Sequence, residues 1–137
     1  MILAFCVDDQ GGLAFNHRRQ SRDRALVADL LAAAGARPVF CLTYSVGLFE
    51  PGAVTVTDDP GVVPADGILF LENADPAAYL PHAEELLLYR WNRLYPADLT
   101  LRGKPVQWGY RLQDTTDFAG TSHEKITRER YVKKERA

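Results

Sequence analysis

Short apolar runs that alternate with helix-like segments constrain the fold of this chain more than any other feature of its sequence. Residues 2–8, 38–42, 68–71 and 86–91 are apolar runs of strand length, and residues 53–57 add another after a Pro-Gly turn. Consecutive parallel strands need a crossover connection, which is usually a helix. The alternation therefore predicts an α/β fold with a mostly parallel, twisted sheet that carries helices on both faces.

Capping residues indicate where the helices between these strands begin and end. Ser21 is a good N-cap for a helix whose apolar side chains recur at helical spacing until Gly35 stops it. Residues 43–49 fit a short helix, and the Asp-Pro pair at 75–76 predicts another that ends near residue 85. These helices supply the crossovers that parallel strands require.

The C-terminal part of the sequence departs from this alternation. Residues 99–101 predict a small strand and residues 106–112 a longer one. Residues 126–132 fit either a strand or a helix, and we favour a last strand. Because no helix-like segment separates the last two, we expect an antiparallel hairpin at the edge of the sheet. The sequence has no internal repeat or linker, so residues 1–137 are expected to form a single domain.

Composition narrows the class of protein. The chain has 137 residues, enough to bury about two-thirds of its unfolded surface without a disulfide or a metal. At a net charge of −2 it lacks the basicity of a non-specific nucleic-acid binder, so phosphate recognition must be local. Cys6 and Cys41 lie in apolar runs, as reduced core residues do. Without a signal segment or a stretch of about 18 apolar residues, the chain is expected to be cytoplasmic, with no membrane partner.

Polar side chains follow the strands at the edge where their carboxyl ends meet. In an open α/β sheet, ligands bind beyond this edge. Strand by strand, these polar residues are Asp8, Asp9 and the loop around His17; Thr43, Tyr44 and Ser45; Glu72 and Asn73; and Arg90, Asn92 and Arg93. Because the four loops share one rim, we expect them to form one site. The turn that carries His123 joins this rim if the closing hairpin is long enough.

The residue types on this rim indicate a site for a phosphate group. His17 and His123 are the candidate catalytic residues, because an imidazole gives and takes protons near neutral pH. Arginine side chains bind phosphate bidentately. The candidate ligand-binding residues are Asn16, Arg18, Arg19, Glu72, Asn73, Arg90, Asn92 and Arg93. Nothing in the spacing of these residues demands a metal, and we expect none.

The order of elements resembles dihydrofolate reductase over nearly the whole chain. The segments that carry the resemblance are the opening Met1-Ile2-x-Ala4, the glycine turn at 11–12, the run 38–40 before a Thr-started helix, the Pro-Gly pair at 51–52 and the leucine-rich run 86–89. The resemblance implies a dihydrofolate reductase-like fold. Asp23 lies near the position of the family's catalytic carboxylate, but we expect it to act as a helix-dipole partner in the first turn.

Three anchors of that family are missing from the sequence. The glycine pair that brings backbone amides onto the cofactor pyrophosphate is replaced by Glu72-Asn73, whose carboxylate repels phosphate. The Gly-Arg pair that grips cofactor phosphate is Leu42-Thr43, and the arginine that holds the folate carboxylate is Ala53. We therefore expect no cofactor and no NADPH-dependent folate reduction.

The polar segments 15–21, 90–98 and 122–127 also resemble a group of small bacterial proteins that carry the automatic label ribonuclease Z. Enzymes of that name bind zinc through a His-x-His-x-Asp-His cluster. The three histidines of this chain, at positions 17, 82 and 123, do not have that spacing. The second resemblance therefore implies no zinc-dependent nuclease site.

Two classes of function fit these observations. The first is a cytosolic, cofactor-less protein that binds a nucleotide, an RNA or another small phosphate-bearing molecule at the rim. If it is an enzyme, we expect a hydrolase or transferase, such as a metal-independent phosphodiesterase or ribonuclease that uses His17. The alternative is a non-catalytic module whose arginine-rich rim is closed by salt bridges or recognises a partner, including a second copy of the chain.

Overall fold

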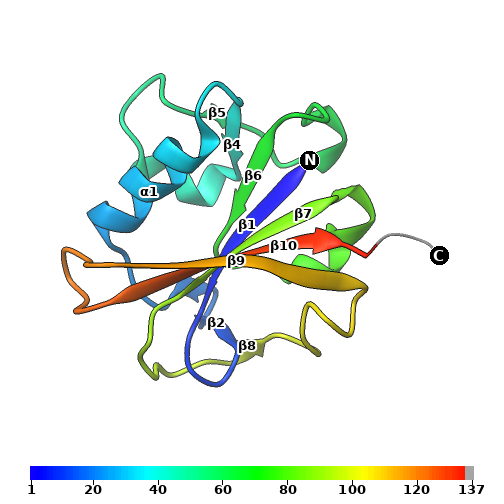
Figure 1. Cartoon of the computed structure of the whole chain (residues 1–137). Helices are drawn as coiled ribbons and strands as arrows, with labels where there is room; N and C mark the ends of the chain where they lie inside the picture. The colour runs from blue at the N-terminus through cyan, green and yellow to red at the C-terminus, as the bar shows by residue number, and fades with distance from the viewer. Residues whose placement is uncertain (135–137) are drawn as a thin grey trace.

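A seven-stranded mixed sheet forms the centre of the molecule in the computed structural model, which describes residues 1–134 (Figure 1). Its strand order is β5-β4-β6-β1-β7-β10-β9, and a smaller three-stranded sheet has the order β3-β2-β8. The strands are β1 (Ile2–Val7), β2 (Gly12–Phe15), β3 (Arg18–Arg19), β4 (Val39–Cys41), β5 (Thr55–Val56), β6 (Ile68–Leu71), β7 (Glu85–Arg90), β8 (Leu99–Thr100), β9 (Tyr110–Phe118) and β10 (Ile126–Lys133). The predicted α/β fold is confirmed.

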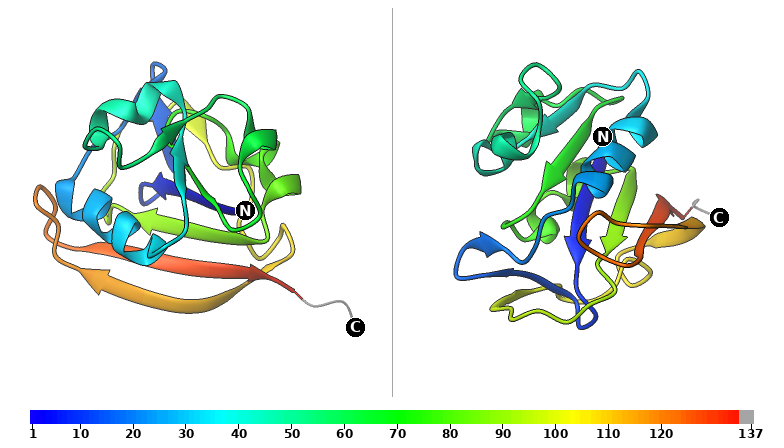
Figure 2. Two further views of the ribbon diagram at one scale, coloured as in Figure 1. Left: turned by 90° about the horizontal axis from the view of Figure 1, so that it is seen from above. Right: turned by 90° about the vertical axis from the view of Figure 1, so that its left-hand side faces the viewer.

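The pairing of the strands brings their carboxyl ends to one edge. β1 pairs in parallel with β6 and β7, and β4 pairs in parallel with β5 and β6. β10 runs antiparallel to both β7 and β9. The predicted edge hairpin is therefore confirmed, and Figure 2 shows it running along one whole side of the molecule.

Side chains of the central strands alternate between two hydrophobic cores, one on each face of the sheet. In β1, Ala4 and Cys6 pack on the face covered by helix α1 (Arg24–Ala34), whereas Leu3 and Phe5 pack on the opposite face. Because both faces of these strands are buried, the sequence shows continuous apolar runs rather than alternation.

Helices cover less of the sheet than the sequence predicts. α1 is the only α-helix within residues 1–134, and the other helices are the 3-10 turns η1 (Thr43–Leu48), η2 (Pro60–Val62), η3 (Pro76–Ala78) and η4 (Leu80–His82). The helix predicted over 75–85 is thus split into two short turns, and Glu85 already begins β7. Pro81 explains the break, because proline has no amide hydrogen to donate within an α-helix.

The N-cap of α1 is Asp23, two residues later than predicted. Its Oδ1 accepts a hydrogen bond from the Ala25 amide at 2.8 Å, and its backbone is extended, as an N-cap requires. Gly35 ends the helix with a φ of 58°, as the sequence predicts. The prediction of Ser21 as the cap was wrong, and Ser21 is left outside the helix for another role.

The hairpin β2–β3 was not predicted from the sequence. Asn16 and His17 form its two-residue turn with φ angles of 52° and 63°, the left-handed conformation that such hairpin turns need at both central positions. Figure 2 shows this hairpin projecting away from the main sheet. An Asn-Gly pair is the usual sequence signal for a two-residue hairpin turn. Here histidine occupies the second turn position, so the sequence lacks that signal.

The first strand of the edge hairpin, predicted over 106–112, begins and ends later than expected. Residues 106–109 form turns, with φ at Gly109 of 93°, and β9 begins at Tyr110. Trp108 is therefore in a turn, half-buried, where its indole nitrogen donates to the Arg102 carbonyl at 3.1 Å. Among residues 1–134, none of the helices has the length and apolar character needed to cross a lipid bilayer.

Removing the anchor of α1 on the sheet should destabilise the fold without touching the rim. Leu30 is fully buried in the core between α1 and the sheet. We expect Leu30→Ala to lower the free energy of unfolding by about 2 to 5 kcal/mol, because it leaves a cavity in a packed interior. Chemical denaturation monitored by circular dichroism measures this change. The half-buried Leu31 is the matched control, and an equal loss for Leu31→Ala would contradict the placement of the helix.

Candidate functional site

The predicted rim exists at the carboxyl ends of β1, β4, β6 and β7, and the β9–β10 turn joins it. Thr127 of β10 lies opposite Arg90, the last residue of β7. The Asn92 amide side chain donates to the Lys125 carbonyl at 3.1 Å and to Thr127 Oγ1 at 2.9 Å. These bonds tie the turn that carries His123 to the loop after β7, so five chain segments meet at one edge.

The predicted site residues share this edge but line four separate pockets. Arg90 lines one of about 520 Å³, and Asn16, Arg18 and Arg19 line one of about 310 Å³. Asn92, Arg93 and His123 line a third of about 400 Å³, and His17 and Asn73 line a fourth of about 450 Å³. The two candidate catalytic histidines thus lie in different pockets.

The direction of side chains along β7 explains part of this separation. Successive residues of a strand point to opposite faces of the sheet. Tyr89 and Trp91 belong to the core on the α1 face, and Leu88 belongs to the core on the other face. Arg90, which lines the same pocket as Leu88, therefore lies across the sheet from His123, whose ring stacks on Trp91.

Two predicted ligand-binding residues, Arg19 and Glu72, form an ion pair at the carboxyl end of β6. Arg19 donates from Nε to Glu72 Oε2 at 2.8 Å and from Nη2 to Glu72 Oε1 at 2.9 Å. Ser45 Oγ donates to the same carboxylate at 2.8 Å, and the Arg19 guanidinium lies 4.6 Å from the centre of the Tyr44 ring. Glu72 is 9% exposed, so its charge is satisfied by protein groups rather than by water.

Further bonds fix the β2–β3 hairpin against the rim. Asn73 donates from its side-chain amide to the His17 carbonyl at 2.9 Å, and the Asp98 carboxylate accepts from the Asn16 amide at 3.1 Å. The Tyr44 hydroxyl accepts from the Arg19 amide at 2.9 Å. Asn16 and Asn73, predicted to bind a ligand, here hold the backbone of the hairpin. The imidazole of His17 is exposed beside the carboxylates of Asp75 and Asp98.

A second cluster, built around His123 and Asp23, lies on the α1 side of the rim. The His123 Nδ1 lies 2.9 Å from Asp23 Oδ2, and both side chains are almost completely buried. Because a carboxylate only accepts hydrogen bonds, this contact places the ring hydrogen on Nδ1. The Nε2 atom of a neutral ring is then an acceptor that points toward hydroxyl groups.

Two hydroxyl groups meet this Nε2 atom. Ser21 Oγ lies 3.1 Å from it and the Tyr95 hydroxyl 2.7 Å. The Trp91 indole stacks against the other side of the imidazole, with ring centres 4.5 Å apart and planes 25° apart. His123 is therefore held in position and orientation by four side chains, as an acid–base residue needs.

The Asp23 carboxylate is held in its charged form by the surrounding backbone. Burial by itself would raise its pKa, but hydrogen bonds from the Thr121 amide at 2.9 Å, from His123 and from the Ser122 amide at 2.8 Å outweigh burial and lower it. Gly120 permits this approach, because a Cβ on it would lie 2.6 Å from Asp23 Oδ2. The expected helix-dipole role of Asp23 thus accounts for only part of its contacts.

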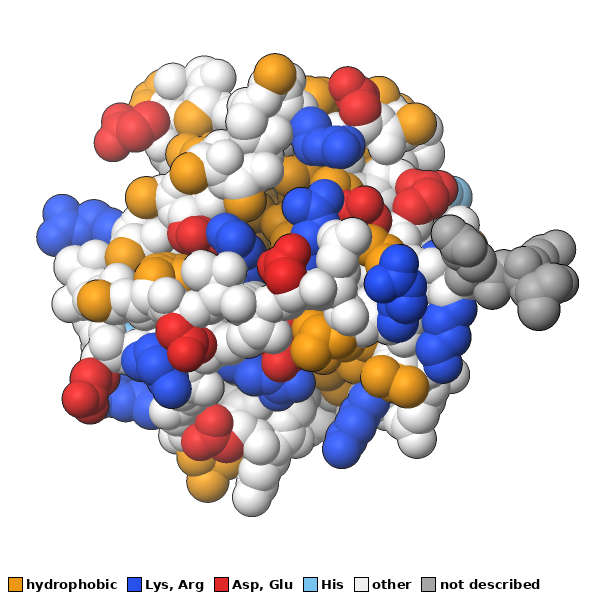
Figure 3. Space-filling view, viewed as in Figure 1, with side chains coloured by type: hydrophobic (Ala, Val, Ile, Leu, Met, Phe, Trp, Pro, Cys, Tyr) orange, Lys and Arg blue, Asp and Glu red, His pale blue; other side chains and the backbone are white. Residues whose placement is uncertain are grey.

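The pocket beside His123 carries a net positive charge, because Arg93 and Lys125 outnumber the carboxylate of Glu124. Its lining consists of Trp91, Asn92, Arg93, His123, Glu124 and Lys125. Arg93 and Lys125 have no ion-pair partner within the part of the chain that is described, so their charges face solvent. Over the molecular face in Figure 3, by contrast, basic and acidic side chains are interspersed. An anion is therefore favoured locally, at the mouth of the His123 pocket.

Sequence reasoning found His123 but missed the residues around it. Ser21 was predicted as a helix cap and Asp23 as a dipole partner. The available signal was the pair of short polar side chains, Ser21 and Asp23, in front of α1 at the carboxyl edge of the sheet. Within residues 1–134, no group of three or more His, Cys, Asp or Glu side chains is arranged to hold a metal ion.

Comparisons with known proteins support the fold. No protein-family model and no curated protein matches the sequence. Among solved structures, the chain is similar to a dihydrofolate reductase from Enterococcus faecalis complexed with NADP(H) and RAB-propyl. The TM-score is 0.67 at 8% sequence identity, and the match covers 98% of this chain and 97% of that chain. The chain therefore has a dihydrofolate reductase-like fold, and at this identity the similarity shows the fold alone.

The buried Asp23 carboxylate should make stability depend on pH. Its pKa is lower in the folded state, so its contribution is full above the unfolded value of about 3.9 and is lost as the pH falls through the folded value. We expect Asp23→Asn to cost about 2 to 4 kcal/mol at pH 7 and clearly less at pH 3.

Urea unfolding of both proteins at the two pH values measures this difference. Asp66→Asn, at an exposed carboxylate, is the control. An equal cost of Asp23→Asn at both pH values would contradict a charged Asp23 in the fold.

Proposed function

We propose that this protein is a metal-independent hydrolase or transferase that acts on a phosphate-bearing ester at the rim, with His123 as the general base. The observation that carries the proposal is the buried Asp23–His123 pair, in which the Nε2 atom of the ring lies 3.1 Å from Ser21 Oγ. A nucleophile, a base and a group that orients the base within hydrogen-bond reach are the geometric signature of nucleophilic catalysis.

The arrangement supports a two-step reaction. The Ser21 hydroxyl gives its proton to His123 Nε2 while Ser21 Oγ attacks the phosphorus atom, and the bond from phosphorus to the leaving oxygen breaks. His123 then returns the proton to that oxygen. Water, or an acceptor alcohol, reverses the sequence and releases the phosphoryl group from Ser21. Asp23 keeps the ring in the required tautomer and stabilises the imidazolium that forms in between.

Charge on either side of this cluster favours an anionic substrate. Arg93 and Lys125 line the pocket beside His123. The exposed Arg18 lines the neighbouring pocket that Tyr95 borders, where Arg19 is already paired with Glu72. The pocket of His17, in contrast, contains Asp75 and Asp98, which repel a phosphate. This contrast favours His123 over His17 as the base. A small phosphoester or a nucleotide fits the size of these pockets, and an RNA end reaches them from solvent.

The proposal includes no nicotinamide cofactor. Glu72 follows β6, where the resemblance to reductases calls for a phosphate-binding glycine pair, and Arg19 already neutralises it. A pyrophosphate in that position would have to break this ion pair and then face the freed carboxylate.

A second candidate function is a non-catalytic module, favoured by that same ion pair. Arg19 and Glu72, together with the bonds of Asn73 and Asp98 to the hairpin, satisfy part of the rim within the protein. In this alternative, the remaining cations recognise a protein partner or a second copy of the chain.

The catalytic proposal is tested with bis-p-nitrophenyl phosphate and short RNA as substrates. We expect Ser21→Ala and His123→Gln each to lower kcat/KM by at least about 100-fold, because they remove the nucleophile and its base. Tyr95→Phe, which keeps both, should stay within about tenfold of the parent protein. His82→Ala, at an exposed histidine, is the control.

Circular dichroism shows that each variant is folded before its activity is compared. Turnover that survives Ser21→Ala and His123→Gln but is lost in His17→Ala would place the chemistry at His17. If the parent protein turns over none of these phosphoesters, the result would contradict the catalytic proposal and favour the non-catalytic module.

The ion network predicts a separate effect on stability. Glu72→Gln keeps the shape of the side chain but removes its charge, so Arg19 is left half-buried without a counter-charge. We expect a loss of about 1 to 3 kcal/mol in the free energy of unfolding and faster amide exchange across β2 and β3. Hydrogen exchange read by mass spectrometry locates the change. If the hairpin amides exchange at unchanged rates, the ion pair does not hold the hairpin.

A further inference from the structure

The pocket of about 520 Å³ lies across the sheet from His123 and takes no part in the proposed reaction. Its floor lies on the second core, where Val7 of β1 and Leu88 of β7 are each only 1% exposed, so the apolar surface open to a ligand comes from the side chains around them. Leu101 closes the floor from the segment after β8, and the exposed Val106 stands at the wall. A hydrocarbon or aromatic group placed here would leave water for an apolar surface.

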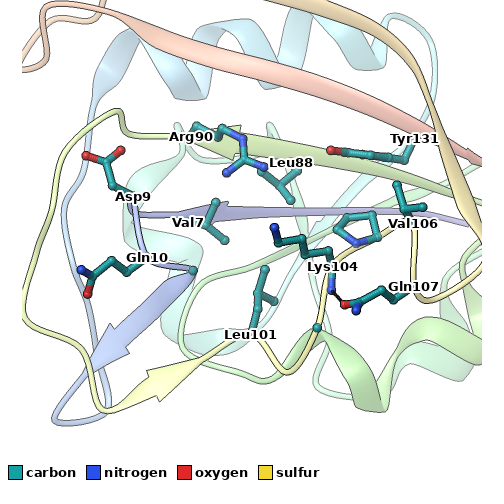
Figure 4. A pocket seen from close by; sticks show the side chains of 13 residues that line it. Val7, Asp9, Gln10, Leu88, Arg90, Leu101, Lys104, Val106, Gln107 and Tyr131 are labelled. Atoms are coloured by element: carbon teal, nitrogen blue, oxygen red, sulfur yellow. Dashed lines mark hydrogen bonds between the residues drawn. The ribbon is translucent and has the colours of Figure 1, made fainter.

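Two cations reach into the same pocket. Figure 4 shows the guanidinium of Arg90 and the ammonium group of Lys104 turned toward the same space beside Val7, while the Asp9 carboxylate points away from it. Arg90 donates its Nε hydrogen to Glu129 at 2.8 Å, which fixes the guanidinium in place. Lys104 has no ion-pair partner among residues 1–134. Glu129 offsets part of the Arg90 charge, but the unpaired Lys104 beside it leaves the pocket with an excess of positive charge, which favours an anion.

We propose that this pocket is a binding site for a small organic anion, whose acidic group lies between Arg90 and Lys104 and whose apolar body packs against Leu101 and Val106. An inorganic phosphate would make no use of the apolar wall at Leu101 and Val106, and a neutral hydrocarbon would leave Lys104 without a partner. The pocket therefore selects molecules that carry both features, such as aryl or alkyl carboxylates and sulfonates.

The site is independent of the proposed reaction. Arg90 and Trp91 are neighbours in sequence, but Arg90 lines this pocket whereas Trp91 stacks on His123 across the sheet. A ligand in this pocket consequently touches neither His123 nor Ser21. Its binding can succeed or fail whatever the outcome of the activity measurements.

The probe for this test is 8-anilinonaphthalene-1-sulfonate, an aryl sulfonate whose fluorescence rises in an apolar site. We expect the folded protein to bind one molecule saturably, and Lys104→Glu to weaken binding at least about tenfold, because one attractive charge becomes repulsive. Lys104 is exposed, so the substitution is compatible with folding. The uncharged analogue N-phenyl-1-naphthylamine should bind more weakly than the sulfonate.

The matched control is Lys125→Glu, which makes the same charge change in the His123 pocket. It should leave the affinity for the sulfonate within about twofold, since that charge lies across the sheet. Weakening by Lys125→Glu rather than by Lys104→Glu would place the probe at the rim and overturn the proposal. Absence of saturable binding, or equal binding of the uncharged analogue, would overturn it as well.

Discussion

The buried carboxylate of Asp23 joins parts of the chain that are far apart in sequence. It caps α1 through the Ala25 amide, accepts the amides of the turn between β9 and β10, and bonds the His123 ring. A charge that deep in a protein is tolerated only when every lone pair has a partner. One side chain therefore ties the turn of the edge hairpin to the start of the helix and also helps to orient the imidazole.

In this dihydrofolate reductase-like fold, the carboxyl edge of the sheet carries charged side chains and a histidine, where the resemblance calls for a glycine pair that binds phosphate. One side of the rim is closed by Arg19 and Glu72, and the other side presents a histidine supported by a carboxylate. The sheet stays the same while the chemistry of the loops changes, as is general for folds that host many functions. The function proposed here depends on those loop residues and not on the similarity of the fold.

The sequence was a good guide to the sheet and a poor guide to its connections. Continuous apolar runs predict strands at the centre of the sheet, because both faces of such strands are buried and all their side chains are apolar. The hairpin β2–β3 was missed because its turn uses Asn16 and His17 in place of glycine, and the helix over 75–85 was wrong because Pro81 outweighs a favourable start. Partners about 100 residues apart, such as Asp23 and His123, are set by packing that no local pattern records.

Two glycines give the rim an unusual sensitivity to mutation. Gly120 makes room for Asp23, and at Gly12 an added carbon would lie 2.4 Å from Asp8 Oδ2, so each missing side chain leaves space for a buried carboxylate oxygen. A methyl group added at Gly12 would overlap the carboxylate of Asp8, and one added at Gly120 would overlap the carboxylate of Asp23. Substitution at either glycine therefore requires a buried carboxylate to move from its hydrogen-bond donors.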